Sequence, residues 1–219
     1  MASSEIAGSH VAGSHVTRYG MVIDLKRCIG CNACTVACKQ ENGTPEGVHF
    51  ARVVTREVGT YPATKRTFLP VLCNHCTDAP CSEACPTGAT YIRADGIVMV
   101  DREKCIGCRA CNVACPYMNR HFVAKGLLKH GYGTNGLSPY EAIKFMDFEE
   151  GTNIKCTLCA LRVDQGLEPA CVITCPTDAR IFGDVEDPNG KLQRLIKDRN
   201  GWTLSPEYNT KPNVFYLDE

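Results

Sequence analysis

The cysteine pattern constrains this chain more than any other feature. Its 219 residues include sixteen cysteines, which divide into four groups of four with none left over. We number these groups in chain order as motif one (Cys28, Cys31, Cys34, Cys38), motif two (Cys73, Cys76, Cys81, Cys85), motif three (Cys105, Cys108, Cys111, Cys115) and motif four (Cys156, Cys159, Cys171, Cys175). Motifs one and three follow C-x2-C-x2-C-x3-C, the run that binds a cubane 4Fe-4S cluster. The pattern predicts four such clusters and a protein that conducts electrons.

Zinc and disulfide bonds are the alternatives for so many cysteines. Motifs two and four have longer gaps between their second and third cysteines, and either alone fits a zinc site. Pro86, Pro116 and Pro176 follow the last cysteines of motifs two, three and four, as in iron-sulfur motifs, whereas Lys39 follows motif one as a tolerated variation. A disulfide scaffold would force strained short loops, and the sequence shows no secretory signal. A zinc-bearing structural or nucleic-acid module remains the alternative of a different class.

Short predicted strands connect the motifs in pairs. Between motifs two and three, residues 89–93 and 97–101 are β-rich runs joined across Asp95-Gly96, which predicts a hairpin. Motifs two and three therefore have the layout of a bacterial two-cluster ferredoxin. Residues 19–25 lead into motif one, and a second β-rich run follows motif four. Pairing these two strands would rebuild the same hairpin without its turn.

These pairings predict an α+β fold of two ferredoxin-like units, one nested within the other, with loop insertions. The interval from Cys85 to Cys105 is the shortest between motifs, which favours nesting over the alternative, tandem pairing of neighbouring motifs. The predicted segments are a flexible small-residue tail (1–18), an outer unit with motifs one and four (19–72 and 145–219), an inner unit with motifs two and three (73–116), and an insert that contacts a partner (117–155).

The ligand sets follow from the pairing. In a two-cluster ferredoxin the last cysteine of each motif binds the cluster of the other motif, because one tight loop reaches only three irons. The expected sets are cluster 1 (Cys28, Cys31, Cys34, Cys175), cluster 2 (Cys156, Cys159, Cys171, Cys38), cluster 3 (Cys73, Cys76, Cys81, Cys115) and cluster 4 (Cys105, Cys108, Cys111, Cys85). Every iron then has four ligands and no open position for substrate, so we expect no catalytic residue.

Several charged residues lie beside the predicted ligands. These residues are Lys26, Arg27, Lys104, Arg109, Lys155 and Arg162. We expect their positive charges to raise the cluster potentials, because a cation favours the more negative reduced state. The alternative is that they are ordinary solvated charges. His75 lies between two cysteines of motif two, where it either tunes a potential or simply packs.

The remaining sequence gives weaker signals. Residues 49–58 and 65–72 suggest a pair of strands, and Ser138 with a following proline and Glu141 predicts a short helix to about Phe148. We expect residues 201–219 to pack along a domain without forming an element. The net charge of zero argues against nucleic acid, and no apolar run is long enough to span a membrane.

The four cysteine segments together resemble one family. They read CIGCNACTVACKQEN, CNHCTDAPCSEACPTGA, CIGCRACNVACPY and KCTLCALRVDQGLEPACVITCPTDARIFGD. They are similar to the four-cluster ferredoxin-type electron-transfer subunits of the dimethyl sulfoxide reductase superfamily, especially those of polysulfide, thiosulfate and respiratory arsenate reductases. The likeness extends from Tyr19 to Leu217. The family uses the nested ligation, and the retained Cys108, which some relatives replace by tryptophan, implies four 4Fe-4S clusters.

The resemblance implies a role and partners. It implies a non-catalytic subunit that relays electrons between a catalytic subunit carrying bis-molybdopterin guanine dinucleotide and an integral membrane, quinone-reactive subunit or another redox partner. The equivalent subunit of a hydrogenase or formate dehydrogenase is the alternative. Relatives without their own signal are carried by an exported partner, so we expect a peripheral protein of a membrane-associated complex on the extracytoplasmic face, with the cytoplasmic face as the alternative.

Overall fold

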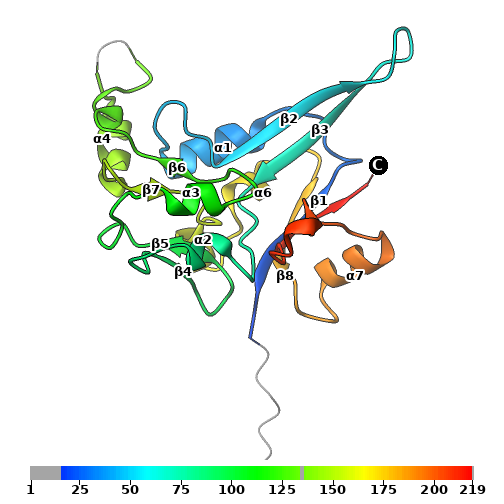
Figure 1. Cartoon of the computed structure of the whole chain (residues 1–219). Helices are drawn as coiled ribbons and strands as arrows, with labels where there is room; N and C mark the ends of the chain where they lie inside the picture. Colours follow the sequence, from blue (N-terminus) through cyan, green and yellow to red (C-terminus); the bar gives the residue numbers. More distant parts are fainter. Residues whose placement is uncertain (1–15, 134–135, 219) are drawn as a thin grey trace, which may run out of the picture.

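The structure is a computed structural model that describes residues 16–133 and 136–218. Its strands are β1 (Tyr19–Asp24), β2 (Ala51–Val58), β3 (Lys65–Leu72), β4 (Thr90–Ile92), β5 (Val98–Val100), β6 (His121–Phe122), β7 (Asn153–Ile154), β8 (Arg180–Asp184) and β9 (Val214–Leu217). Its α-helices are α1 (Ala33–Asn42), α2 (Pro80–Glu83), α3 (Ala110–Ala114), α4 (Pro139–Lys144), α5 (Ala160–Val163), α6 (Ala170–Ile173) and α7 (Lys191–Asp198). Short 3-10 helices cover Leu127–Lys129, Phe145–Asp147 and Pro206–Tyr208. Strands and short helices are mixed along the chain (Figure 1), as the α+β prediction requires.

The sheet β8-β1-β9 joins the two ends of the chain. β1 pairs antiparallel with β8, from Tyr19 opposite Asp184 to Ile23 opposite Arg180. The predicted pairing between the strand before motif one and the strand after motif four is therefore present. Residues 201–219 were expected to form no element, and this prediction was wrong, because β9 pairs in parallel with β1. Val214, Tyr216 and Leu217 are buried there, and their burial stabilises β9 as an edge strand of the sheet. The sequence pattern did not reveal this strand.

A second, smaller hairpin connects motifs two and three. β4 and β5 are antiparallel, with Thr90 opposite Val100 and Ile92 opposite Val98, and Gly96 has a φ of 83° in the turn. This is the predicted hairpin. The backbone N–H of Tyr19 donates to the carbonyl of Asp95 at 2.9 Å, so the start of β1 lies against this turn.

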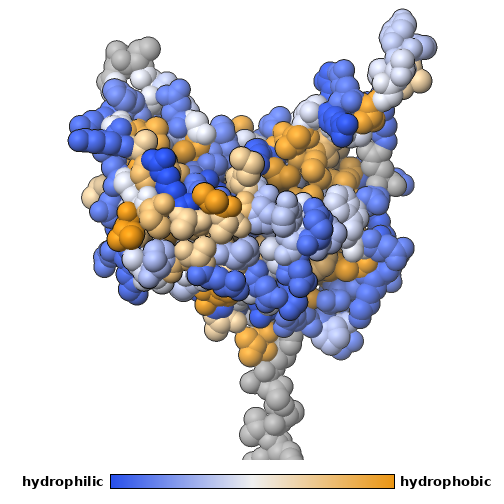
Figure 2. Space-filling view, viewed as in Figure 1, coloured by the Kyte–Doolittle hydropathy of each residue, from blue (hydrophilic) through white to orange (hydrophobic). Residues whose placement is uncertain are grey.

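The long hairpin β2–β3 projects from the body (Figure 1), in the two ranges that the sequence predicted. Its proximal end is buried at Ala51 and Leu72, and its distal end is exposed. On the opposite side of the same view, the helix α4 also stands out from the body. Figure 2 shows a hollowed face between these two projections, with apolar side chains gathered on it.

The predicted helix in residues 117–155 is α4. Ser138 accepts from the backbone N–H of Glu141, and the Glu141 carboxylate accepts from the backbone of Ser138 at 2.8 Å, which completes a capping box. The α-helix ends at Lys144 and a 3-10 turn follows. The insert packs on α1 and on the loop that follows it. The Lys144 Nζ donates to the carbonyl of Glu41 in α1 at 2.7 Å, and the Tyr132 hydroxyl donates to that of Pro45 in the loop at 3.0 Å.

The predicted N-terminal tail falls largely outside the described residues, which begin at residue 16. Arg18, its last predicted residue, is held in the fold. Its backbone N–H donates to Asp184 at 3.2 Å, and its Nε pairs with Glu186 at 2.6 Å. Arg18 therefore belongs to the folded part of the chain and not to the predicted tail.

Candidate iron-sulfur sites

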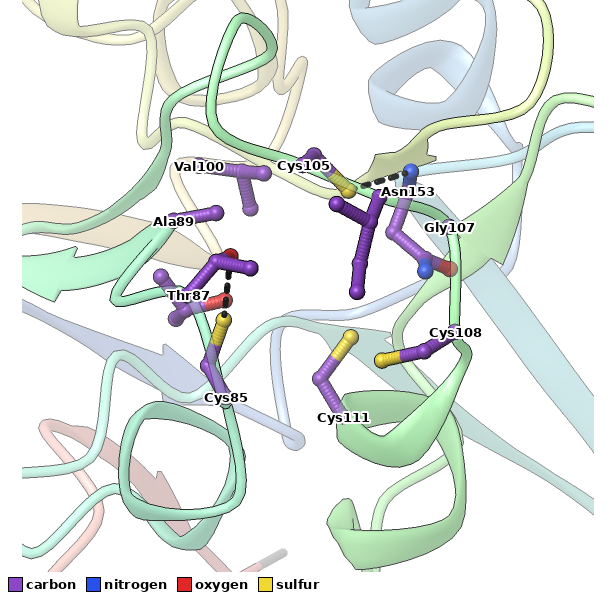
Figure 3. Close-up of a pocket in the computed structure, with 11 residues that line it drawn as sticks. Cys85, Thr87, Ala89, Val100, Cys105, Gly107, Cys108, Cys111 and Asn153 are labelled. Atoms are coloured by element: carbon purple, nitrogen blue, oxygen red, sulfur yellow. Dashed lines mark hydrogen bonds between the residues drawn. The ribbon is translucent and has the colours of Figure 1, made fainter.

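One cavity gathers three cysteines of motif three and the last cysteine of motif two. Cys85, Cys105, Cys108 and Cys111 line a small cavity beside the β4–β5 hairpin and α3. Their sulfur atoms point inward from different segments of the chain (Figure 3). The backbone N–H of Asn153 donates to the Cys105 Sγ at 3.4 Å. The arrangement brings together the four residues predicted for cluster 4.

A second cavity gathers three cysteines of motif two and the last cysteine of motif three. Cys73, Cys76, Cys81 and Cys115 line this cavity together with Val98 and Tyr117. Among the described residues, no group of three or more His, Cys, Asp or Glu side chains is close enough to hold a single metal ion. The cysteines instead surround volumes, which suits a multi-iron core held at its corners.

The outer cysteines also approach one another across the chain. The Cys28 thiol has a raised pKa because it is partly buried and because it faces Cys34 and Cys175. Burial, with Cys171 and Cys159 nearby, raises the pKa of Cys38 to about 12. The last cysteine of motif four thus lies with motif one, and the last cysteine of motif one lies with motif four.

Two glycines shape the cysteine loops of motifs one and three. Gly30 and Gly107 both precede the second cysteine and have φ values of 68° and 66°. A Cβ on Gly30 would collide with the ring of Phe68, and one on Gly107 would collide with the carbonyl oxygen of Gly151. Both positions therefore require glycine for conformation and for space.

Motifs two and four place side chains at the same loop position. His75 and Leu158 precede the second cysteines there, with φ values of 43° and 53°, although neither is glycine. Both side chains are almost fully buried. The His75 Nδ1 accepts from the backbone N–H of Val98 at 3.0 Å, and burial lowers the His75 pKa well below its usual value. Packing therefore compensates the strained backbone, and a neutral His75 serves in that packing.

Backbone donors aim at three ligand sulfurs. Besides the bond to Cys105, Leu158 N–H donates to the Cys156 Sγ at 3.4 Å and Ala179 N–H donates to the Cys175 Sγ at 3.3 Å. Such N–H···S bonds orient thiolates and stabilise the negative charge of a reduced cluster. The donor set therefore fits iron-sulfur clusters.

Three cations lie inside the molecule near these sulfurs. They are Arg120, Lys155 and Arg180, which are 5%, 3% and 3% exposed. Arg120 Nη2 donates to the Cys81 Sγ at 3.0 Å, and Arg180 Nη1 lies 3.7 Å from the Cys171 Sγ. The Arg120 Nε and the Arg180 Nη2 are buried and have no protein acceptor. Cluster sulfides at these sites would supply acceptors for donors that are costly to leave unpaired.

Only Lys155 of these three was singled out from the sequence. Arg120 and Arg180 were missed, although each stands at the same spacing after the last cysteine of its motif, in CPYMNR and CPTDAR. The other predicted cations lie nearer the surface: Lys26 is exposed, Arg27 pairs with Asp24, Lys104 pairs with Asp101, Arg162 pairs with Glu41, and Arg109 stacks on Phe122. Carboxylate partners or solvent screen most of these charges from the cluster sites.

Comparison with known proteins now identifies the family. Models of the 4Fe-4S dicluster domain match residues 27–89, 64–129 and 124–185. The arsenate respiratory reductase iron-sulfur subunit of Shewanella sp. (strain ANA-3) is 41% identical, over 91% of this chain and 96% of that relative. The chain belongs to the four-cluster ferredoxin-type iron-sulfur subunits of the dimethyl sulfoxide reductase superfamily.

Other iron-sulfur subunits of this family give the same result. The matching tetrathionate reductase subunit of Salmonella typhimurium is 42% identical, over 91% of this chain and 72% of its own length. The matching sulfite dehydrogenase subunit of Allochromatium vinosum is 38% identical, over 92% and 83%. The cofactors of this iron-sulfur subunit are four 4Fe-4S clusters, and its role is to relay electrons in a reductase complex. The zinc-module alternative is therefore rejected. No helix in the part of the chain that the structure describes has the length and apolar character of a membrane span.

Proposed function

We propose that the four clusters form one path, in the order cluster 1, 2, 3, 4, held by the ligand sets of the nested pairing. The β1–β8 pairing supports this proposal, since it brings motif four to motif one. Electrostatic proximity supports the order: Cys34 of cluster 1 faces Cys171 of cluster 2, and Cys156 of cluster 2 faces Cys73 of cluster 3. Clusters 3 and 4 would occupy the two cavities of the inner unit.

Solvent exposure at the two ends carries this proposal. Among the sixteen cysteines, Cys31 and Cys108 are the exposed ones. They belong to the first and the last proposed clusters. Electrons would therefore enter at one of these loops and leave at the other. Ile29 and Ile106, beside them, are 58% and 67% exposed, which suits contact with apolar partner surfaces.

The partners follow from the family. One end would face a catalytic subunit that carries bis-molybdopterin guanine dinucleotide, and the other an integral membrane, quinone-reactive subunit. Relatives named as subunits of arsenate, tetrathionate and sulfite oxidoreductases favour this over a hydrogenase or formate dehydrogenase. This chain would be non-catalytic, because the four cysteines of each proposed set give every iron of the cluster one thiolate beside its three sulfides, which leaves no open position for substrate. The complex would lie at the extracytoplasmic face, carried there by its exported partner.

Purification of the native complex tests the function. We expect a large subunit that releases a pterin guanine dinucleotide on denaturation, together with molybdenum or tungsten and about sixteen irons in this chain. Protease protection of this chain in sealed vesicles of known orientation would report the face of the membrane. A large subunit with nickel and no pterin would refute the assignment of the partner.

The insert is proposed as a partner contact. One face of the insert packs against α1 of the same chain, but the side chains of Ile143 and Met146 remain 69% and 74% exposed. Replacing both with aspartate should prevent co-purification of a partner subunit while leaving the iron content intact. Arg66→Gln, at the exposed pair with Glu57 on the projecting hairpin, is the matched control. Full assembly of the aspartate variant would exclude this contact.

A further inference from the structure

Arg120, Lys155 and Arg180, the buried cations, have no carboxylate partner within residues 16–133 and 136–218. Arg120, Lys155 and Arg180 take part in none of the salt bridges of the described residues. An isolated buried charge is costly and persists only with a compensating charge nearby. Here the nearby anionic groups are cysteine thiolates of the proposed ligand sets.

Arg180 stands between the two clusters of the outer unit. Its Nη1 lies 3.7 Å from the Cys171 Sγ of cluster 2. It also interacts electrostatically with Cys28 and Cys34 of cluster 1. Because β8 begins at Arg180 and pairs with β1, the strand that brings the two motifs together also places this guanidinium between them.

Arg120 occupies the equivalent place in the inner unit. Its Nη2 donates to the Cys81 Sγ of cluster 3 at 3.0 Å, and it interacts electrostatically with Cys111 of cluster 4. Its Nη1 donates to the Thr90 Oγ1 at 3.0 Å, which anchors the side chain on β4. The same spacing after the last cysteine therefore yields the same position in both units.

Lys155 stands where the two units meet. Its Nζ donates to the carbonyl of Val98 in the inner unit and, at 2.5 Å, to the carbonyl of Cys156 in the outer unit. It interacts electrostatically with Cys156 of cluster 2 and with Cys81 of cluster 3. The third cation thus lies at the remaining junction of the path.

We propose that Arg180, Lys155 and Arg120 are positioning residues for electron transfer, one at each junction of the path, between clusters 1 and 2, 2 and 3, and 3 and 4. This inference rests on the ligand sets of the proposed function. Reduction adds negative charge to a cluster, and a cation between two clusters stabilises an electron on either side. Each cation therefore raises the potentials of its two neighbours together and favours transfer between them.

Redox titration of the purified four-cluster protein, followed by electron paramagnetic resonance, tests this proposal. Cys→Ser variants first assign the signals: Cys175→Ser should remove cluster 1, and Cys115→Ser should remove cluster 3. Arg180→Gln should then lower the reduction equilibrium constants of clusters 1 and 2 at least tenfold, which is about 59 mV for a one-electron couple. Arg120→Gln should do the same for clusters 3 and 4, and Lys155→Gln for clusters 2 and 3.

The controls separate charge from shape. Arg180→Lys and Arg120→Lys keep the charge and should cancel most of each shift in potential, whereas Arg66→Gln should shift no potential. A uniform shift of all four clusters, or a shift of one cluster alone, would overturn the proposal. If a glutamine variant does not assemble, the variant that keeps the charge decides (Arg180→Lys, Arg120→Lys or Lys155→Arg), because its smaller shifts must still fall on the same two clusters. Failure of Cys175→Ser to remove cluster 1 would instead refute the ligand sets.

Discussion

The second cysteines of the four motifs lie in two different environments. In motifs one and three they are Cys31 and Cys108, which are exposed; in motifs two and four they are Cys76 and Cys159, each 8% exposed. The regular motifs have glycine before this cysteine, and the irregular motifs have a buried side chain. We infer that the regular motifs hold the surface clusters of the path, and that motifs two and four build its interior.

The difference has a physical basis. In the surface loops, the Phe68 ring and the Gly151 carbonyl leave no room for a Cβ at Gly30 and Gly107, so these turns require glycine at positive φ. An interior loop is packed on all sides, and burial of Leu158 or His75 offsets the strain of a non-glycine residue there. In the interior, the cluster and the hydrophobic core therefore stabilise each other, whereas at the surface the second cysteine of the loop is exposed to solvent.

Removal of a cysteine should distinguish these regions most strongly. Cys156→Ser should abolish assembly of the whole protein, because its thiolate lies in the main hydrophobic core, whereas Cys31→Ser should lose only about four irons and keep the rest. Iron content and near-ultraviolet circular dichroism would measure both. Equal losses in the two variants would mean that the interior clusters support the fold no more than the surface ones do.

Shortening the buried side chain of an interior cysteine loop should have the next largest effect. Leu158→Ala would retain the positive φ but remove packing from the main core, so we expect a loss of about 2–5 kcal/mol in the free energy of unfolding. Denaturant titration of the loaded protein, with cluster absorbance as the signal, would measure it. Leu161→Ala, at a 79% exposed position on α5, is the control and should be nearly neutral.

Motif one can be made to resemble the other motifs by Lys39→Pro. In the other three motifs a proline follows the last cysteine, but α1 continues through Lys39 to Asn42. The Lys39 Nζ also donates to the carbonyls of Val48 and Pro45, at 2.7 and 2.9 Å. Proline inside this helix should cost about 3 kcal/mol, measured by thermal unfolding. A neutral result would show that α1 does not need its last turn.

The smallest expected effect concerns the contact between the units. Arg93 of the inner hairpin pairs with Asp164 of motif four at 2.5 Å, and this pair lowers the pKa of Asp164. Asp164→Asn should reduce the melting temperature only slightly, because the pair is exposed to solvent. The deficit should disappear in 1 M salt, which screens the wild-type pair. A large, salt-independent loss would mean that the two units depend on this contact.

The cysteine spacing by itself determined the chemistry, because three sulfurs on a short loop reach three irons wherever that loop lies. Local turn and capping signals likewise predicted the β4–β5 hairpin and the start of α4 at Ser138. These features depend on residues a few positions apart, so their reasons are present in the sequence.

The tertiary structure alone decided which cations are buried and which motifs are interior. The spacing of Arg180 after Cys175 does not by itself show that the side chain is buried; Arg180 is buried because β8 pairs with β1 and β9 covers the other edge of β1. Arg120 is buried by contacts to Thr90 and Cys81 from other segments. Burial depends on segments that are distant along the chain, and no local spacing encodes their convergence.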